Sequence, residues 1–183
     1  MPEYHIAQIN IARMLAPIDD PIMAEFVAQL PPINALAEGS PGFVWRLQSE
    51  SGDATSIKVY EDEMVIINLT VWQSVDALRE YVYKSAHSGV MRDRKRWFEK
   101  FDGPYYALWW IPAGHLPDPQ EGKERLKYLR EYGDAAYAFS FKKVFPNLWS
   151  RAKLTASPHV RVKCSIERNG CLDSRRRWLS MLF

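Results

Sequence analysis

The segment that decides the fold runs from residue 64 to residue 84 and reads MVIINLTVWQSVDALREYVYK. Its first half is an apolar run rich in β-branched side chains, which is typical of a strand. Ser74 then supplies a helix N-cap, and Asp76 places a negative charge in the first helical turn, where the helix dipole favours it. The segment therefore predicts a strand that passes almost directly into a helix.

Two further helices are predicted from the residues at their ends. The clearer one runs from Asp118, as N-cap, to Gly133, and Glu121 completes a capping box. The other helix begins at Asp20. The two prolines at 31–32 are expected to interrupt or kink it, because proline lacks the N–H that a helix interior needs.

Apolar and aromatic runs predict the remaining strands at residues 5–15, 42–49 and 105–111, with a short last strand at 137–145. The order along the chain is β-α-β-β-α-β, followed by a helix and a strand. This order predicts an α+β fold of the ferredoxin-like kind, a four-stranded antiparallel sheet with helices on one face. Residues 1–146 are expected to form this single domain.

One face of the predicted sheet mixes amide and large aromatic side chains. Strand alternation places Gln8 and Asn10 of the first strand on the same face, together with Asn68, Thr70 and Trp72 of the third. Such a wall suits an organic ligand, and it also suits a dry interface between the two sheets of a dimer. Both interpretations stay open at this point.

Charge divides the chain into two parts. Residues 151–183 contain eight of the 24 Lys and Arg residues but only two of the 22 acidic residues. Their net charge is therefore +6, and that of residues 1–150 is −4. A mildly acidic body argues against a nucleic-acid-binding face. Residues 147–183 are expected to be a basic, poorly ordered C-terminal tail.

The expected location is cytoplasmic, with no membrane partner. No apolar run approaches the ~18 residues of a membrane-spanning helix, and the first residues lack the pattern of a secretory signal. The two cysteines are too few for a disulfide framework, and the four histidines lack the spacing of zinc ligands. No metal site is therefore expected.

Four strings carry a resemblance to a known family: GFVWRLQ, LTVWQSVDALREYVYKSAH, RDRKRWF and LWWIPAGHLPDPQEGKERLKYLREYG. Over residues 3–146 the chain resembles an uncharacterised single-domain family of the dimeric α/β-barrel superfamily. That superfamily also holds the antibiotic-biosynthesis monooxygenases and the haem-degrading monooxygenases. The resemblance implies a homodimer of ferredoxin-like protomers, which together form a dimeric α/β barrel, and a small-molecule ligand.

The resemblance also implies catalytic residues. The haem-degrading branch uses an Asn on the first strand, a Trp near the end of the third and a His around the second helix. Asn10, Trp72 and His87 occupy comparable elements in this chain. The antibiotic-biosynthesis branch oxidises electron-rich aromatic substrates without metal or flavin, so its proteins need only bind, deprotonate and shield the substrate.

His87 has three interpretations: a helix-end residue stabilised by the helix dipole, a general base, or an axial haem ligand. Arg46, Asn68, Thr70 and Trp110 are the predicted substrate-binding residues. The leading hypothesis is a monooxygenase-like enzyme that uses no cofactor and acts on a hydrophobic or aromatic small molecule. The alternatives are a haem-binding or haem-degrading protein and a non-catalytic dimer that binds a small molecule.

Overall fold

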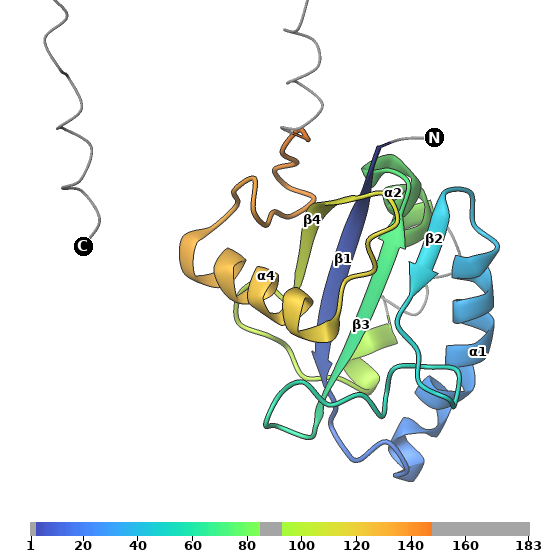
Figure 1. The fold of residues 1–183 in the computed structure, drawn as a ribbon. Coiled ribbons are helices and arrows are strands. Elements are labelled where there is room, and N and C mark those ends of the chain that lie inside the picture. The colour runs from blue at the N-terminus through green and yellow to red at the C-terminus, as the bar shows by residue number, and fades with distance from the viewer. Residues whose placement is uncertain (1–2, 85–92, 148–183) are drawn as a thin grey trace, which may run out of the picture. The chain divides into compact units, whose positions relative to one another are not determined.

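The computed structural model describes residues 3–84 and 93–147 (Figure 1). None of the helices in these ranges is long and apolar enough to cross a bilayer. Two single turns of 3-10 helix, Pro21–Met23 and Arg94–Arg96, precede α1 and β4. The larger elements are β1 (Tyr4–Arg13), α1 (Ala24–Glu38), β2 (Phe43–Arg46), β3 (Val65–Trp72), α2 (Val75–Lys84), β4 (Tyr106–Pro112) and α4 (Pro119–Tyr132).

β3 and α2 confirm the strand and helix predicted for residues 64–84. The Ser74 hydroxyl accepts the N–H of Ala77 at 3.1 Å, which is the bond expected of an N-cap. Residues 148–183 of the predicted tail lie outside the described residues, so its order stays a prediction.

The four strands pair antiparallel in the order β2-β3-β1-β4. In the central strand β1, Asn10 stands opposite Asn68 of β3 on one side and Tyr106 of β4 on the other. One helix follows β1 and another follows β3, which together with this strand order is the ferredoxin-like arrangement. The predicted fold class is therefore confirmed.

Helices α1 and α2 pack on the face of the sheet that carries the amides, which we call the amide face. This face presents Gln8 and Asn10 of β1 and Asn68, Thr70 and Trp72 of β3. The two helices close its apolar part in one buried cluster, which contains Ile6, Ala37, Trp72, Val75, Leu78, Leu108 and Phe139.

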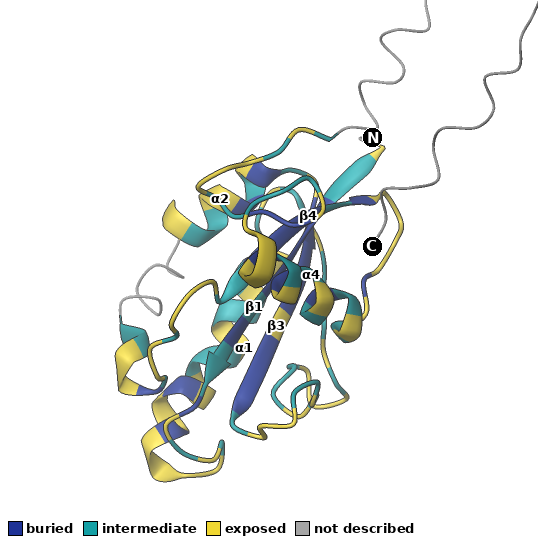
Figure 2. Ribbon diagram, turned by 90° about the vertical axis from the view of Figure 1, so that its left-hand side faces the viewer, coloured by how far each residue is buried: buried dark blue, intermediate teal, exposed yellow. Residues whose placement is uncertain are grey.

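The opposite face of the sheet is covered by α4 and by the segment 47–60. Leu126 and Leu129 of α4 pack on it, and a Cβ atom at Gly122 would lie 2.8 Å from Cδ1 of Ile9. The buried side chains of β1, β3 and β4 in this cluster are at most 6% exposed, and these strands are largely dark blue in Figure 2. Helices were predicted on one face only. α4 departs from that expectation because its own apolar side needs an apolar surface to cover, and this face offers one.

Of the interruption or kink expected in the first helix, the interruption is wrong, because α1 runs through Pro31 and Pro32 without a break. The carbonyl groups that lose their N–H partners belong to Val27 and Ala28, four residues earlier. Both of these residues and both prolines are exposed, so water can bond to the freed carbonyls.

The strand expected at 137–145 is reduced to a single antiparallel bridge between Leu108 and Phe139. The two residues exchange backbone hydrogen bonds of 2.8 and 2.9 Å. Just beyond the bridge, the carboxylate of Asp134 accepts the N–H of Ser140 at 2.6 Å. The next donor that a longer strand would have paired with β4, the N–H of Phe141, bonds to the hydroxyl oxygen of Tyr106 at 3.3 Å instead.

Candidate functional site

A continuous chain of side-chain hydrogen bonds crosses the amide face. The indole Nε1 of Trp72 donates to Oγ1 of Thr70 at 3.0 Å, and the Thr70 hydroxyl donates to Oε1 of Gln8 at 2.9 Å. Nε2 of Gln8 donates to Oδ1 of Asn10 at 2.8 Å, and Nδ2 of Asn68 donates to the same oxygen at 3.0 Å. We call these five residues the amide chain.

The strand register brings the five residues of the amide chain together. Residues two apart on a strand point to the same face of a sheet. The β1–β3 pairing sets Gln8 opposite Thr70 and Asn10 opposite Asn68. Directly opposite residues have Cβ atoms about 4.5–5.5 Å apart, which short polar side chains can span. The sequence pattern of both strands is therefore sufficient to build the chain.

The direction of these bonds fixes how the Asn10 amide is turned. Its Oδ1 accepts two hydrogen bonds, so its Nδ2 faces the other way and can only donate. Gln8 and Thr70 are buried, Asn10 is half-buried and Asn68 is exposed. Within the described ranges Nδ2 of Asn10 has no partner, which leaves this donor for a ligand.

Trp72, a predicted catalytic residue, forms the buried end of the amide chain. Its side chain has no exposed surface. The indole lies edge-on to Phe43 at a centroid distance of 5.3 Å and stacks on Tyr81 at 5.0 Å. Burial raises the pKa of Tyr81 to about 12, so this ring stays neutral at neutral pH. Trp72 can therefore act on a ligand only indirectly, by holding the Thr70 hydroxyl toward Gln8.

Arg46 and Trp110, both predicted to bind substrate, have partners outside the amide chain. Nε of Arg46 donates to Oε1 of Glu38 at 2.7 Å, and a terminal nitrogen donates to the carbonyl of Gly52 at 2.8 Å. Nε1 of Trp110 donates to the carbonyl of Phe145 at 2.8 Å. Of the predicted substrate-binding residues, the structure thus joins Asn68 directly to Asn10, and Thr70 to Asn10 through Gln8.

The described part of the site consists of neutral polar and aromatic side chains. His87, the predicted base, lies in residues 85–92, outside the described residues, so its role stays a prediction. Within the two described ranges, no three His, Cys, Asp or Glu side chains gather in a group that could hold a metal ion.

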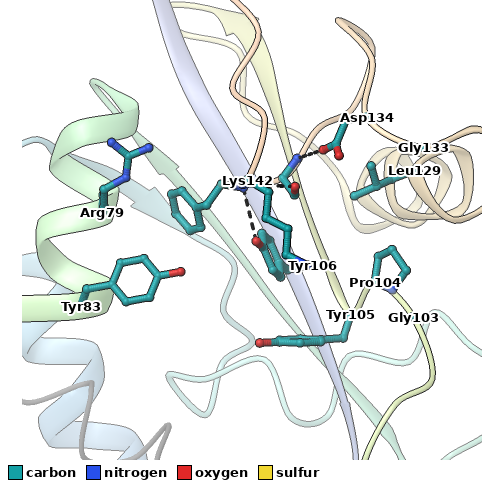
Figure 3. A pocket seen from close by; sticks show the side chains of 12 residues that line it. Arg79, Tyr83, Gly103, Pro104, Tyr105, Tyr106, Leu129, Gly133, Asp134 and Lys142 are labelled. Carbon is teal, nitrogen blue, oxygen red and sulfur yellow. Dashed lines mark hydrogen bonds between the residues drawn. The ribbon is translucent and has the colours of Figure 1, made fainter.

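A groove of about 790 Å³ runs along the outer edge of β4 (Figure 3). Three segments that are distant in the sequence form it: α2, residues 103–106 at the entry to β4, and the end of α4 with the residues that follow it. We call it the edge groove. The side chains that give it its chemical character are Arg79, Tyr83, Tyr105, Tyr106, Phe141 and Lys142.

Ring contacts hold the walls of the edge groove. The Tyr106 ring lies 5.4 Å from Tyr105 and 5.7 Å from Phe141, and Phe141 lies 5.6 Å from Tyr83, all measured between centroids. The Tyr106 hydroxyl oxygen accepts the N–H of Phe141 at 3.3 Å. Burial raises the pKa of Tyr106, so at neutral pH its hydroxyl keeps the proton and can donate it to a ligand.

Tyr106 lies between the amide chain and the edge groove. It stands opposite Asn10 in the β1–β4 pairing, which puts both side chains on the amide face, and it also lines the groove. Tyr106 could not be singled out from the sequence, because an aromatic residue at a strand start is a common core residue. The register of β1 against β4 is the observation that identifies it.

The sequence matches the model of a family described as "Domain of unknown function (DUF3291)" over residues 5–154. The chain belongs to the DUF3291 family. The matched region contains the whole amide chain and the whole edge groove, so both lie within the DUF3291 domain. The predicted resemblance to an uncharacterised family is confirmed. No curated protein matches the sequence.

Solved structures similar to this DUF3291 chain include proteins described as oxygenases. SnoaB, a cofactor-independent oxygenase from Streptomyces nogalater, is 14% identical with a TM-score of 0.41, over 63% of this chain and 97% of that one. A putative antibiotic biosynthesis monooxygenase from Chloroflexus aurantiacus is 16% identical with a TM-score of 0.40, over 61% and 96%.

A third similar structure is a monooxygenase from the gene ActVA-Orf6 of Streptomyces coelicolor in complex with nanaomycin D. It is 15% identical with a TM-score of 0.38, over 65% of this chain and 96% of that one. Likeness at this level does not carry any residue's role from these proteins to the DUF3291 chain.

Proposed function

We propose that this chain binds a hydrophobic or aromatic small molecule at the open end of the amide chain and oxygenates it without a metal or an organic cofactor. The turned amide of Asn10 is the observation that supports the proposal. Its two N–H bonds are directed in advance by Gln8 and Asn68, on a part of the sheet face that is not fully buried. Donors fixed in this way stabilise negative charge as it develops on a substrate oxygen.

The reaction class that suits such donors is the oxidation of a phenol to a quinone. Removal of the hydroxyl proton gives an electron-rich anion, which passes one electron to dioxygen. The substrate radical and superoxide then combine to a peroxide on a ring carbon, and this peroxide takes the proton held by the base. Loss of the hydrogen of that ring carbon as a proton breaks the O–O bond and forms the second carbonyl, and the departing hydroxide takes up this proton as water. One phenol and one dioxygen thus give one quinone and one water.

The residues of the site divide this work. Asn10 and Asn68 would hold the phenolate oxygen, and His87 is proposed as the base that takes the hydroxyl proton. Trp72, Thr70 and Gln8 are positioning residues, because they act on the ligand only through the orientation of Asn10.

Asn10→Asp is the sharpest test of this proposal. The aspartate keeps an oxygen that can accept from Gln8 and Asn68 but replaces the Nδ2 donor by a second acceptor. We expect the chelator-treated wild-type protein to consume oxygen with a hydroxynaphthalene or an anthrone, and Asn10→Asp to lose most of that rate. Gln48→Ala is the matched control, since Gln48 is an exposed amide outside the chain.

Oxygen uptake should fall in variants of the amide chain and of His87, and it should be unchanged in Gln48→Ala. An equal fall in Gln48→Ala would show that the assay does not report on Asn10 and would overturn the assignment. Ligand binding by the wild type with no oxygen uptake from any phenol would overturn the oxygenase and leave the non-catalytic alternative.

The homodimer that the resemblance implies is also a proposal. α1 and α2 pack on the amide face and α4 on the opposite one, so neither face of the sheet is wholly bare for sheet-on-sheet pairing in the described part of the chain. We therefore propose that a dimer, where it forms, uses helix or strand-edge surfaces. Light scattering on the purified protein measures whether one or two chains are present.

A further inference from the structure

We propose that the edge groove is a binding site for a planar aromatic anion. The ring system lies between the aromatic walls, and the anionic group lies beside Arg79 and Lys142. This site is separate from the donors of the amide chain and does not depend on the oxygenase proposal. Nothing in the family description assigns it.

The size and the walls of the groove suit an aromatic ring system. Its volume of about 790 Å³ falls within the roughly 300–1,000 Å³ that small-molecule sites occupy. Figure 3 shows Tyr83 on the α2 side of the groove, with Tyr105 and Tyr106 on the β4 side. Aromatic faces and edges on both sides favour a flat ring inserted between them, stacked or edge-on.

The charges around the groove favour an anion. Lys142 has no carboxylate partner among the described residues. Arg79 bonds Oδ1 of Asp76 at 3.1 Å, but the Asp76 side chain is 87% exposed, so the pair is open to water and weak. The one acid that lines the groove, Asp134, already accepts the N–H of Ser140 at 2.6 Å. Two cations therefore face one engaged carboxylate.

The same charges argue against two other possible occupants of the groove, the basic residues 151–183 and a neutral aromatic compound. Residues 151–183 carry a net charge of +6, and two cations in the groove do not favour an occupant of that sign. A neutral aromatic compound could contact the walls but would gain nothing from the two cations. An aromatic carboxylate, sulfonate or phenolate matches both the walls and the charge.

A pair of fluorescent probes with one ring framework tests the proposal. 1-Anilinonaphthalene-8-sulfonate carries an anionic group, and N-phenyl-1-naphthylamine has the same rings without it. We expect one sulfonate probe to bind per chain, and Lys142→Ala and Arg79→Ala to weaken its binding about two- to fivefold, as expected for one partly solvated ion pair. The neutral probe should respond to Phe141→Ala but not to either cation variant.

Lys127→Ala is the control, because Lys127 is an α4 lysine that is 71% exposed and does not line the groove. The proposal is overturned when Lys127→Ala weakens the sulfonate probe as much as Lys142→Ala, or when both probes bind equally well. Absence of saturable binding, or one probe per two chains, would overturn it too. Unchanged near-ultraviolet circular dichroism in each variant confirms that the probes meet a folded protein.

Discussion

The indole N–H of Trp109 in β4 donates a hydrogen bond to Oε1 of Glu121 in the first turn of α4, at 2.8 Å. The other carboxylate oxygen lies 2.7 Å from Nε2 of His115. Glu121 was predicted to complete a capping box, but its carboxylate is turned to the sheet instead. Asp118 caps the helix as predicted, by accepting the N–H of Glu121 at 2.8 Å. A polar contact thus fastens α4 to the sheet beside its apolar ones.

Glu121→Ala should destabilise the protein by about 1–3 kcal/mol, because it leaves the fully buried indole N–H of Trp109 without an acceptor. Urea unfolding followed by tryptophan fluorescence measures the loss. Glu124→Ala is the control, since Glu124 is an exposed residue of the same helix. Equal losses in the two variants would contradict a special role for the Trp109–Glu121 bond.

Gly122→Ala should also destabilise the protein, although alanine is the better helix former. The new Cβ would lie 2.8 Å from Cδ1 of Ile9, a side chain with no exposed surface, and such overpacking costs about 1–3 kcal/mol. Ile9→Val removes that Cδ1 atom. We therefore expect the double variant to be more stable than the sum of the single changes implies, which a double-mutant cycle measures.

Stability should fall at alkaline pH through Tyr81. Below pH 10.0, the ordinary pKa of tyrosine, the Tyr81 phenol is neutral in both the folded and the unfolded chain. Its contribution to the stability of the folded chain is then fully present. Burial raises the pKa of Tyr81 in the folded chain to about 12, so between these values only the unfolded chain ionises and unfolding becomes more favourable as pH rises.

The slope of this loss is at most about 1.4 kcal/mol per pH unit for one group. Tyr81→Phe cannot ionise, so its stability should fall less steeply than that of the wild type when urea unfolding is compared between about pH 9 and 11. Tyr132→Phe, which alters a tyrosine that is 70% exposed, should keep the wild-type slope. A wild-type slope in Tyr81→Phe would show that other groups cause the loss.

A hemin titration separates the proposed function from the haem alternative. Because the proposed site acts without a cofactor, we expect hemin to give no saturable Soret shift at one hemin per chain. The His87→Ala variant should then behave like the wild type. A stoichiometric shift that disappears in the variant would make His87 an axial ligand and move the protein to the haem-binding alternative.

The elements of the fold that carry local signals could be predicted from the sequence. Asp118 and Gly133 bound α4 as expected, and Gly133 adopts a φ of 77°, a backbone conformation that favours glycine. The two prolines of α1 led to a wrong prediction of a helix break, because a proline breaks a helix less readily where water can bond to the freed carbonyls. That exposure is a property of the packed structure, not of the local sequence.

The candidate site could be predicted only where strand alternation determines it. Alternation alone puts Asn10, Asn68, Thr70 and Trp72 on one face, and the structure joins them in one hydrogen-bonded chain. Strand alternation does not reveal that the Arg46 side chain forms an ion pair with Glu38, because that contact depends on how α1 lies against β2. The edge groove was missed for a similar reason, since its walls meet only after α2, β4 and the residues after α4 have packed.

The place of α4 on the sheet has a consequence for how the protein responds to dilution. α4 and the segment 47–60 close the apolar face of the sheet from within the same chain, and the buried side chains of β1, β3 and β4 that they cover are at most 6% exposed. In a protein whose sheets are closed by a second copy, mass action makes the unfolding midpoint depend on concentration. Here the apolar core is completed by a covalently attached helix, whose effective concentration does not change on dilution. The core of one DUF3291 chain therefore stays closed in a dilute solution, whatever its surface does with other copies.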